Sequence, residues 1–408
     1  MTAVATWLAE AMKQHQAGHL AAAERIYNNI LRLDPRHGDA LQFLGLIALS
    51  RGDAVGAIER LRQALHINPR AGLYHFHLGL ALSQRGDRAE AGQSYRTAIK
   101  HAPQLVEAHN NLGVLLREAG EPEAAVESLR RAVALRPTYV EGQLNLSTAL
   151  SDLDRVAEAE GVARRALSLA PNLAQAHFQL GAILHKRSLL EDAITAYRAG
   201  LALQPDHLPS LLNLGNALQS LGRIAEAIAV FEQLLARQPH SVEVLNNLGN
   251  ACLALARRDE AIAWYQRALE VDPAYVLALN NLGVALQETG QVEQAIATYR
   301  RALAISPDAD ACNNLGLATQ MFGDYAEARA LFKRAVELRP GFSTAYRHLM
   351  TVMLYDPSLD EAGRWEIAHG FEALYGAPIY ARVAAPDAVA RAAERRLRVG
   401  YVSSDLYE

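Results

Sequence analysis

A row of asparagines recurs along this chain at a spacing of 34 residues, shortened once to 33. A carboxamide carries two N–H donors and a carbonyl acceptor, so a regular row can bind the backbone of an extended peptide whatever its side chains are. The alternative is that each amide bonds to the backbone or to a neighbouring segment and never contacts a ligand, although asparagine inside a helix lowers helix propensity. The row comprises Asn111, Asn145, Asn213, Asn247, Asn281 and Asn314, with His77 and Gln179 keeping it polar and Phe43 interrupting it.

The sequence shows no pattern typical of a catalytic, nucleotide-binding or metal-binding site. The chain contains no GxGxxG, Walker, GxSxG or HExxH motif. His75 and His77 lie two residues apart on a predicted helix, so they point to different faces and suit one metal ion poorly. We therefore expect no catalytic residue, no metal site and no cofactor in this chain.

The composition favours a protein partner. With 40 basic and 44 acidic residues and a net charge of −4, the chain lacks the field that would make nucleic acid or an anionic membrane the expected partner. A protein or an extended peptide is expected instead, and homodimer formation is left open. Cys252 and Cys312 form neither a disulfide framework nor a zinc motif, and no signal peptide or apolar run of 18 residues is present, so we expect a cytoplasmic protein.

The elements that position the asparagines are set by a tandem repeat. Half of the residues are apolar and 6% are aromatic, with alanine and leucine dominant, which predicts an all-α fold. Units of this kind bury their apolar faces on their neighbours instead of in one globular core. The period is carried by prolines 34 residues apart, namely Pro35, Pro69, Pro103, Pro137, Pro171, Pro205, Pro239, Pro273 and Pro307, with Pro340 one residue early.

Each unit is predicted to be a helix, a turn and a second helix. With the proline numbered as position 32 of a repeat, position 8 is glycine with Ser147 as a small substitute, position 20 is alanine and position 24 is mostly large, and a glycine near position 15 ends the first helix. The asparagine row is position 6. At 100° per residue it lies about 200° from position 8, so it points away from the partner helix. Asn216 and Asn250 extend the same face, whereas Asn110, Asn246, Asn280 and Asn313 are turned by 100° and are expected to pack adjacent units.

This pattern, with Trp7 at position 4 and leucine at position 7 in most units, resembles the tetratricopeptide repeat (TPR). Ten units fit over residues 4–342. The resemblance implies a right-handed superhelix, an α-solenoid, whose first helices line a concave groove.

The residues after the repeats are expected to differ. Within residues 343–394 we predict a capping helix over Ser343–Tyr355, a further helix over Glu361–Tyr375 and a linker. Residues 395–408 are predicted to form a lone C-terminal strand.

That strand carries a second resemblance. The run from Arg396 to Asp405, RLRVGYVSSD, resembles the opening strand of the catalytic region of protein O-GlcNAc transferases and their Spindly-type relatives. The resemblance implies an array that delivers protein substrates along an asparagine-lined groove to a glycosyltransferase using a nucleotide sugar such as UDP-GlcNAc. The family's phenylalanine after the aspartate is replaced by Leu406, and the chain ends at Glu408 before the family's histidine. We expect this chain, a truncated form of such an enzyme, to bind and not to catalyse.

Three functions follow from these observations. The first is the substrate-recruiting arm of a glycosyltransferase, with Phe43, His77 and Gln179 adjusting specificity. The second is a non-catalytic TPR adaptor that assembles a protein complex. The third is a chaperone-type carboxylate clamp, which is disfavoured because asparagine stands where lysine and arginine are needed.

Overall fold

The structure is a computed structural model that describes residues 3–357 and 360–373. Within these ranges the chain forms 22 α-helices and no strand, so the all-α prediction is confirmed. The strand predicted for residues 395–408, the linker before it and the end of the helix predicted to reach Tyr375 lie outside the described residues.

Eleven helices occupy the place of a first helix in the repeat. They are α1 (Ala3–Gln16), α3 (Gly38–Ser50), α5 (Gly72–Arg85), α7 (Val106–Glu118), α9 (Val140–Asp152), α11 (Ala174–Lys186), α13 (Leu208–Ser220), α15 (Val242–Ala254), α17 (Val276–Glu288), α19 (Ala309–Met321) and α21 (Ser343–Tyr355).

Ten second helices alternate with them, and one helix follows. The second helices are α2 (Leu20–Leu33), α4 (Ala54–Ile67), α6 (Arg88–His101), α8 (Pro122–Leu135), α10 (Val156–Leu169), α12 (Leu190–Leu203), α14 (Ile224–Arg237), α16 (Arg258–Val271), α18 (Val292–Ile305) and α20 (Tyr325–Leu338), and the last helix is α22 (Glu361–Phe371).

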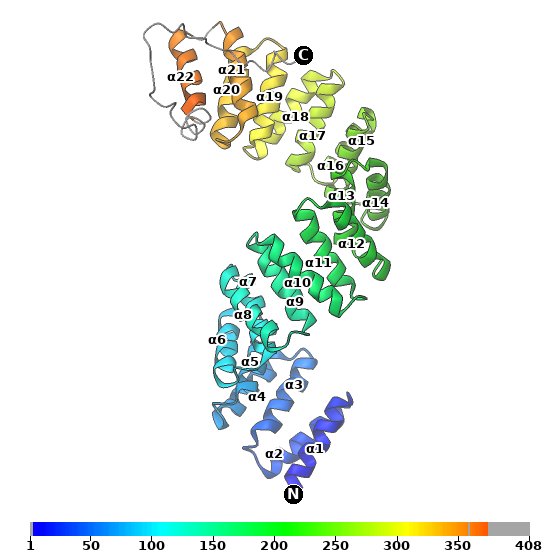
Figure 1. Ribbon diagram of the computed structural model, residues 1–408, viewed down its shortest axis with the longest axis vertical. Helices are drawn as coiled ribbons and strands as arrows, with labels where there is room; N and C mark the ends of the chain where they lie inside the picture. Colours follow the sequence, from blue (N-terminus) through cyan, green and yellow to red (C-terminus); the bar gives the residue numbers. More distant parts are fainter. Residues whose placement is uncertain (1–2, 358–359, 374–408) are drawn as a thin grey trace, which may run out of the picture. The chain divides into compact units, whose positions relative to one another are not determined.

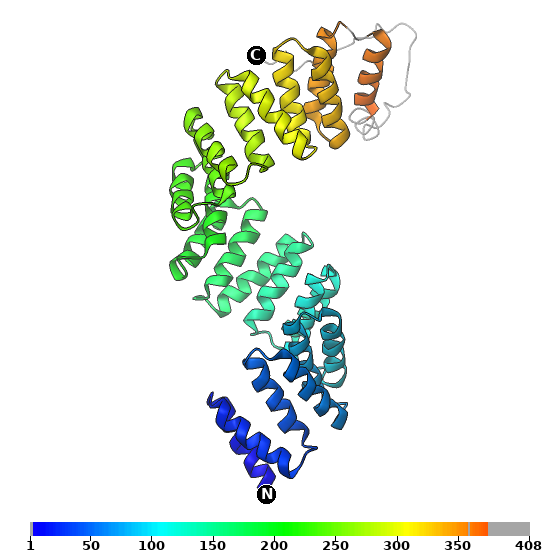
Figure 2. The same ribbon diagram turned by 180° about the vertical axis from the view of Figure 1, so that it is seen from behind.

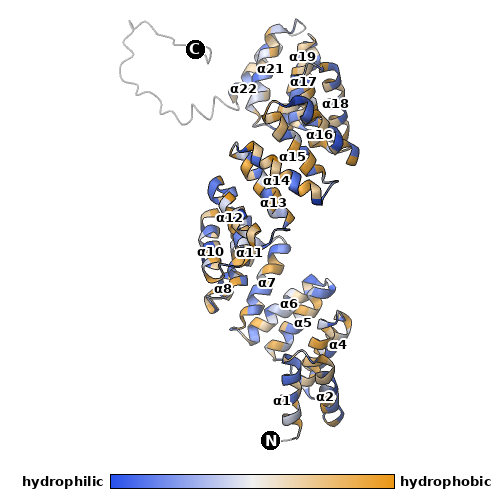
Figure 3. Cartoon of the chain, turned by 90° about the vertical axis from the view of Figure 1, so that its right-hand side faces the viewer, coloured by the Kyte–Doolittle hydropathy of each residue, from blue (hydrophilic) through white to orange (hydrophobic). Residues whose placement is uncertain are grey.

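The chain divides between Arg237 and Gln238 into two compact units. In the first unit, helices α1 to α14 pack each against the next along the chain, and in the second unit α15 to α22 do the same. The succession of antiparallel helix pairs is visible from both sides (Figure 1 and Figure 2). The helices bear both hydrophobic and hydrophilic residues, as expected of helices that bury one face and expose another (Figure 3).

A left-handed residue ends the first helix of every repeat. Seven of these residues are glycine, with φ between 77° and 95°. The other three, Asp154, Ser188 and Ala256, adopt φ of 58° to 59° at the same repeat position. Glycine enters this conformation without a steric penalty, whereas a side chain is strained there.

Small and large residues pack the two helices of a repeat together. A Cβ atom on Gly249 in α15 would lie 2.4 Å from Cε1 of Tyr265 in α16, and Gly283 and Tyr299 show the same relation at 2.4 Å. The ring therefore lies directly on the glycine backbone. The fifth repeat changes both positions, to Ser147 and Ala163, and both residues are fully buried.

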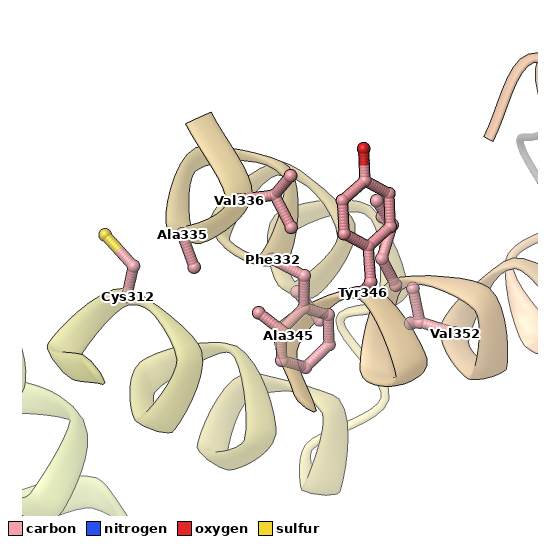
Figure 4. Close-up of a cluster of buried hydrophobic side chains, with 9 residues drawn as sticks. Cys312, Phe332, Ala335, Val336, Ala345, Tyr346 and Val352 are labelled. Atoms are coloured by element: carbon pink, nitrogen blue, oxygen red, sulfur yellow. The ribbon is translucent and has the colours of Figure 1, made fainter. Parts of the chain in front are cut away.

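The core continues from one repeat to the next. In Figure 4, Phe332, Ala335 and Val336 of α20 lie between Cys312 of α19 and Ala345, Tyr346 and Val352 of α21. A second helix thus contributes to the cores of two repeats, and α21 covers the apolar face of the last pair.

Inter-repeat turns are held by a side chain at position 4. In four consecutive repeats its Nε2 atom lies 2.8 to 3.1 Å from the carbonyl oxygen of the preceding repeat proline. The bond fixes the turn relative to the next first helix. The pairs are His75 with Pro69, His109 with Pro103, Gln143 with Pro137, and His177 with Pro171.

Three ion pairs join position 21 of one repeat to position 14 of the next. Most other repeats carry isoleucine or valine at position 21, so these charges occupy a place that is apolar elsewhere. Glu160 and Asp356 are only 3% and 1% exposed. The pairs are Glu24 with Arg51, Glu160 with Arg187 and, with the charges exchanged, Arg329 with Asp356.

Candidate functional site

The predicted site residues all lie on first helices, with partly exposed side chains. Consecutive first helices also contact one another within each unit, for example α7 with α9 and α17 with α19. The row therefore follows the seam between neighbouring first helices. His77 lies on α5, Asn111 on α7, Asn145 on α9, Gln179 on α11, Asn213 and Asn216 on α13, Asn247 and Asn250 on α15, Asn281 on α17 and Asn314 on α19.

An amide ladder crosses this seam. We use the name for hydrogen bonds that join position 6 of one repeat to position 5 of the preceding repeat. In the first unit, Nδ2 of Asn145 donates to Oδ1 of Asn110 at 2.9 Å, and Nε2 of Gln42 lies 2.8 Å from Nδ1 of His77. These side chains are 35 residues apart in sequence and link adjacent repeats.

The second unit repeats the ladder. Nδ2 of Asn281 donates to Oδ1 of Asn246 at 2.9 Å, and Nδ2 of Asn314 donates to Oδ1 of Asn280 at 3.1 Å. The ladder reaches α21, where Nδ1 of His348 lies 2.8 Å from Oδ1 of Asn313. Asn246 and Asn313 are each 5% exposed, so position 5 supplies the buried member of the pair.

Further bonds fix the orientation of individual amides. Nδ2 of Asn110, which is fully buried, also lies 3.2 Å from Oδ1 of Asn111 and 3.3 Å from Oε1 of Glu141. Nδ2 of Asn281 donates to Oδ1 of Asn250 at 3.0 Å, and the hydroxyl of Tyr265 donates to the same oxygen at 2.7 Å. The ring that packs on Gly249 thus also supports a row residue through its hydroxyl.

Burial sets the protonation of the polar groups near the row. It lowers the pKa of His77 to about 4, so this imidazole is neutral near pH 7. Burial also raises the pKa of Tyr95, although its hydrogen bonds with Ser83 and Asn111 oppose the rise. The row from His77 to Asn314 is consequently uncharged near pH 7 and consists of amides and one imidazole.

The ladder and a ligand can share the same carboxamides. An asparagine side chain has two N–H groups and a carbonyl with two lone pairs, so one inter-repeat bond leaves further capacity. The alternative interpretation of the sequence was that the row amides bond to neighbouring segments of the chain. Such hydrogen bonds to the preceding repeat are present at Asn145, Asn281 and Asn314. Contact of the row with a peptide stays a prediction.

The sequence reasoning missed two members of this surface. Gln42 was not identified as the partner of His77, and His348 was not identified as a row residue. The signal was available, because both pairs keep the 35-residue spacing of Asn110 and Asn145. His348 was overlooked because α21 lacks the position-8 glycine and carries Met350 there.

Metal ligands and membrane-spanning helices would point to other kinds of site. Over residues 3–357 and 360–373, no three His, Cys, Asp or Glu side chains gather as a metal site. No helix in the same ranges has the length and apolar character needed to cross a membrane.

Comparisons with known proteins point to one family. The family model described as the tetratricopeptide repeat matches residues 8–72, 76–140, 144–207 and 212–276, and a second model of that repeat matches residues 275–340. No curated protein matches the chain.

Solved structures show a similar arrangement of helices. A tetratricopeptide repeat protein from Parabacteroides merdae is similar with a TM-score of 0.53 and 18% identity, over 61% of this chain and 98% of its own, which shows the fold. Yeast Tom70 aligns over 93% of this chain and 98% of its own at 13% identity and a TM-score of 0.47. MamA aligns over 42% of this chain and 93% of its own at 26% identity and a TM-score of 0.39.

Proposed function

Because this chain belongs to the tetratricopeptide repeat family, we propose that it is a protein-binding scaffold that holds an extended segment of a partner along its first helices. The observation that carries the proposal is the row of partly exposed carboxamides whose orientation is fixed by the amide ladder, as at Asn145 with Asn110 and at Asn281 with Asn246. Groups that are already ordered lose little conformational entropy when they bind, which favours affinity.

The uncharged character of the row suits a main chain as its ligand. Peptide N–H and C=O groups need acceptors and donors, and a carboxamide provides both. A clamp for terminal carboxylates would need cationic groups at position 6, where six of the nine residues from Phe43 to Asn314 are asparagine. The proposed partner is therefore an extended protein segment, and the proposed role is that of an adaptor with a cytoplasmic location.

The experiment uses peptides selected from a random 12-residue phage-display library on the purified chain. In the test variant, Asn247, Asn281 and Asn314, which all lie on first helices of the second unit, are replaced by alanine. Loss of three amide bonds at about 1 kcal/mol each corresponds to binding weaker by about 100-fold. Fluorescence anisotropy measures the affinity, and circular dichroism verifies that the variant is folded.

Asn246→Ala is the matched control. It removes the ladder acceptor for Asn281, whose amide is still held by its hydrogen bond to Oδ1 of Asn250 at 3.0 Å, and it leaves the partly exposed amides of the row in place. The proposal requires strong weakening in the triple variant and little in the control. Equal affinities of the triple variant and the unaltered chain would show that the row serves only to join repeats.

The narrower role as a substrate-recruiting arm depends on other residues. It rests on the run from Arg396 to Asp405, which lies outside the described residues and beyond the family matches, whose last residue is 340. Transfer of a sugar from UDP-GlcNAc would need a nucleotide-sugar fold next to that run. Sequencing the gene beyond the codon for Glu408 tests this role, since several hundred further residues of α/β pattern are required for it.

A further inference from the structure

Two exposed apolar side chains occupy position 13 in the last two first helices. Met321 ends α19 and is 65% exposed, and Tyr355 ends α21 and is 60% exposed. The other nine first helices fold with polar residues or alanine at this position, so packing does not require a large apolar side chain there. Those nine residues are Gln16, Ser50, Gln84, Glu118, Asp152, Lys186, Ser220, Ala254 and Glu288.

A pocket of about 500 Å³ lies at these two residues. Its apolar lining is formed by Leu317, Met321, Tyr325 and Tyr355, and the rings of Tyr325 and Tyr355 stack with centroids 6.2 Å apart. We call these four residues the anchor pocket. A thioether and aromatic rings are polarizable and adapt to apolar groups of different shape, as surfaces that bind varied peptides do.

The rim of the anchor pocket is polar but uncharged. It is formed by Gln287, Gln320 and Thr351, and Nε2 of Gln287 donates to Sδ of Met321 at 3.5 Å. None of the described residues that line the pocket carries a charge. A charged occupant would lose its hydration without gaining a partner, so an uncharged side chain is favoured.

The anchor pocket is continuous with the asparagine row. Leu317 and Met321 follow Asn314 by three and seven residues in α19, and residues at these separations share one helix face. Seven residues of helix span about 10 Å, the length of roughly three residues of extended chain. A peptide bonded to the amide of Asn314 can therefore place a side chain in the pocket.

We propose that the anchor pocket binds a large uncharged side chain, aromatic, methionine or leucine, of the extended segment that the row holds. The inference rests on the proposed function, because the row supplies the contacts to the main chain. The row bonds any sequence, whereas the pocket selects one kind of side chain at one place. The pocket thus gives the scaffold its sequence preference.

The test uses the peptides selected from the random 12-residue library. The selected sequences are expected to share a large uncharged residue at one position, and replacing that residue by aspartate should weaken binding at least tenfold. Met321→Glu should weaken the binding of the unaltered selected peptides by a similar factor. Ala254→Glu is the matched control, because Ala254 is an exposed residue at position 13 in the same unit, and it should change affinity less than twofold.

The outcomes distinguish failure of the pocket proposal from failure of the row proposal. If Asn281→Ala combined with Asn314→Ala abolishes binding while Met321→Glu and Tyr355→Ser do not affect it, the pocket proposal is wrong and the row is supported. If the selected peptides share no large uncharged residue, the pocket proposal is also wrong. If no peptide is selected at all, both proposals fail.

Discussion

Nη1 of Arg329 lies 3.2 Å from Oδ2 of Asp356, and the aspartate is only 1% exposed. The two residues stand at repeat positions 21 and 14, where Glu24 and Arg51 form a pair of the opposite polarity. The same inter-repeat contact thus accepts either order of charges. It also places α21 in register with the preceding first helices.

The buried pair of Glu160 and Arg187 provides a stability prediction. Glu160 is 3% exposed and also contacts Arg164. We expect Arg187→Leu to destabilise the chain by about 2 kcal/mol, because it removes one of the two arginines that pair with the buried carboxylate. The double variant Glu160→Ile, Arg187→Leu copies the apolar pair Ile194 and Leu221, and it should be within about 1 kcal/mol of the parent or more stable.

Hydrogen exchange of the amides in α10 and α11 measures this effect locally, which suits a repeat array whose unfolding need not be two-state. A double variant that loses as much stability as Arg187→Leu would contradict the prediction, since it would show that the ion pair is worth more than the apolar contact.

Glycines at different repeat positions should respond in opposite directions to alanine. Gly249→Ala places a Cβ atom 2.4 Å from the ring of Tyr265, and such overpacking costs about 2 kcal/mol. Gly161 lies within α10, where an added Cβ atom would meet no other atom within 4 Å, so Gly161→Ala should stabilise by about 0.5 to 1 kcal/mol. Urea unfolding monitored by circular dichroism gives the free energy of unfolding of each variant. Equal changes in Gly249→Ala and Gly161→Ala would refute the packing argument.

Ala256 is strained at the end of α15. Its φ of 58° is left-handed, a conformation that costs a residue with a side chain about 1 kcal/mol relative to glycine. Ala256→Gly should therefore raise the melting temperature, and Gly290→Ala, at the same position of the next repeat with φ of 77°, should lower it. A lower melting temperature in Ala256→Gly would show that losing the methyl group costs more stability than relief of the backbone strain provides.

His77 should make stability depend on pH. Burial lowers its pKa in the folded chain to about 4, whereas the ordinary value is 6.5. Between these values the unfolded chain binds a proton that the folded chain does not, so this contribution is lost as the pH falls from about 6.5 to about 4. His77→Asn places an amide at position 6, as in six other repeats, and removes the titrating imidazole.

Melting temperatures of the parent and His77→Asn at pH 7.5 and pH 5.0 measure this contribution. The parent should lose more stability on acidification than the variant. The other histidines are the same in both chains, so the difference between the two isolates His77, and parallel losses would show that folding does not lower the pKa of His77.

Much of the fold could be predicted because the same pattern of residue types recurs in successive repeats. The spacing of Pro35 and its successors, the glycine of position 8 and the alanine of position 20 each recur in register, and they predict paired helices with short turns. Gly249 was correctly expected to need a tiny side chain, although the ring of Tyr265 as its direct neighbour emerges only from the packing.

By itself the sequence determined the all-α repeat and the helix face that carries Asn145 and Asn281, because both depend on local periodicity. The tertiary structure decided that these amides bond to Asn110 and Asn246, that Glu160 is buried against Arg187, and that Met321 and Tyr355 meet at one pocket. Each of these contacts joins residues 27 to 35 positions apart. They depend on how one repeat stacks on the next, and stacking is set by the packing of whole side-chain surfaces, which no local period encodes.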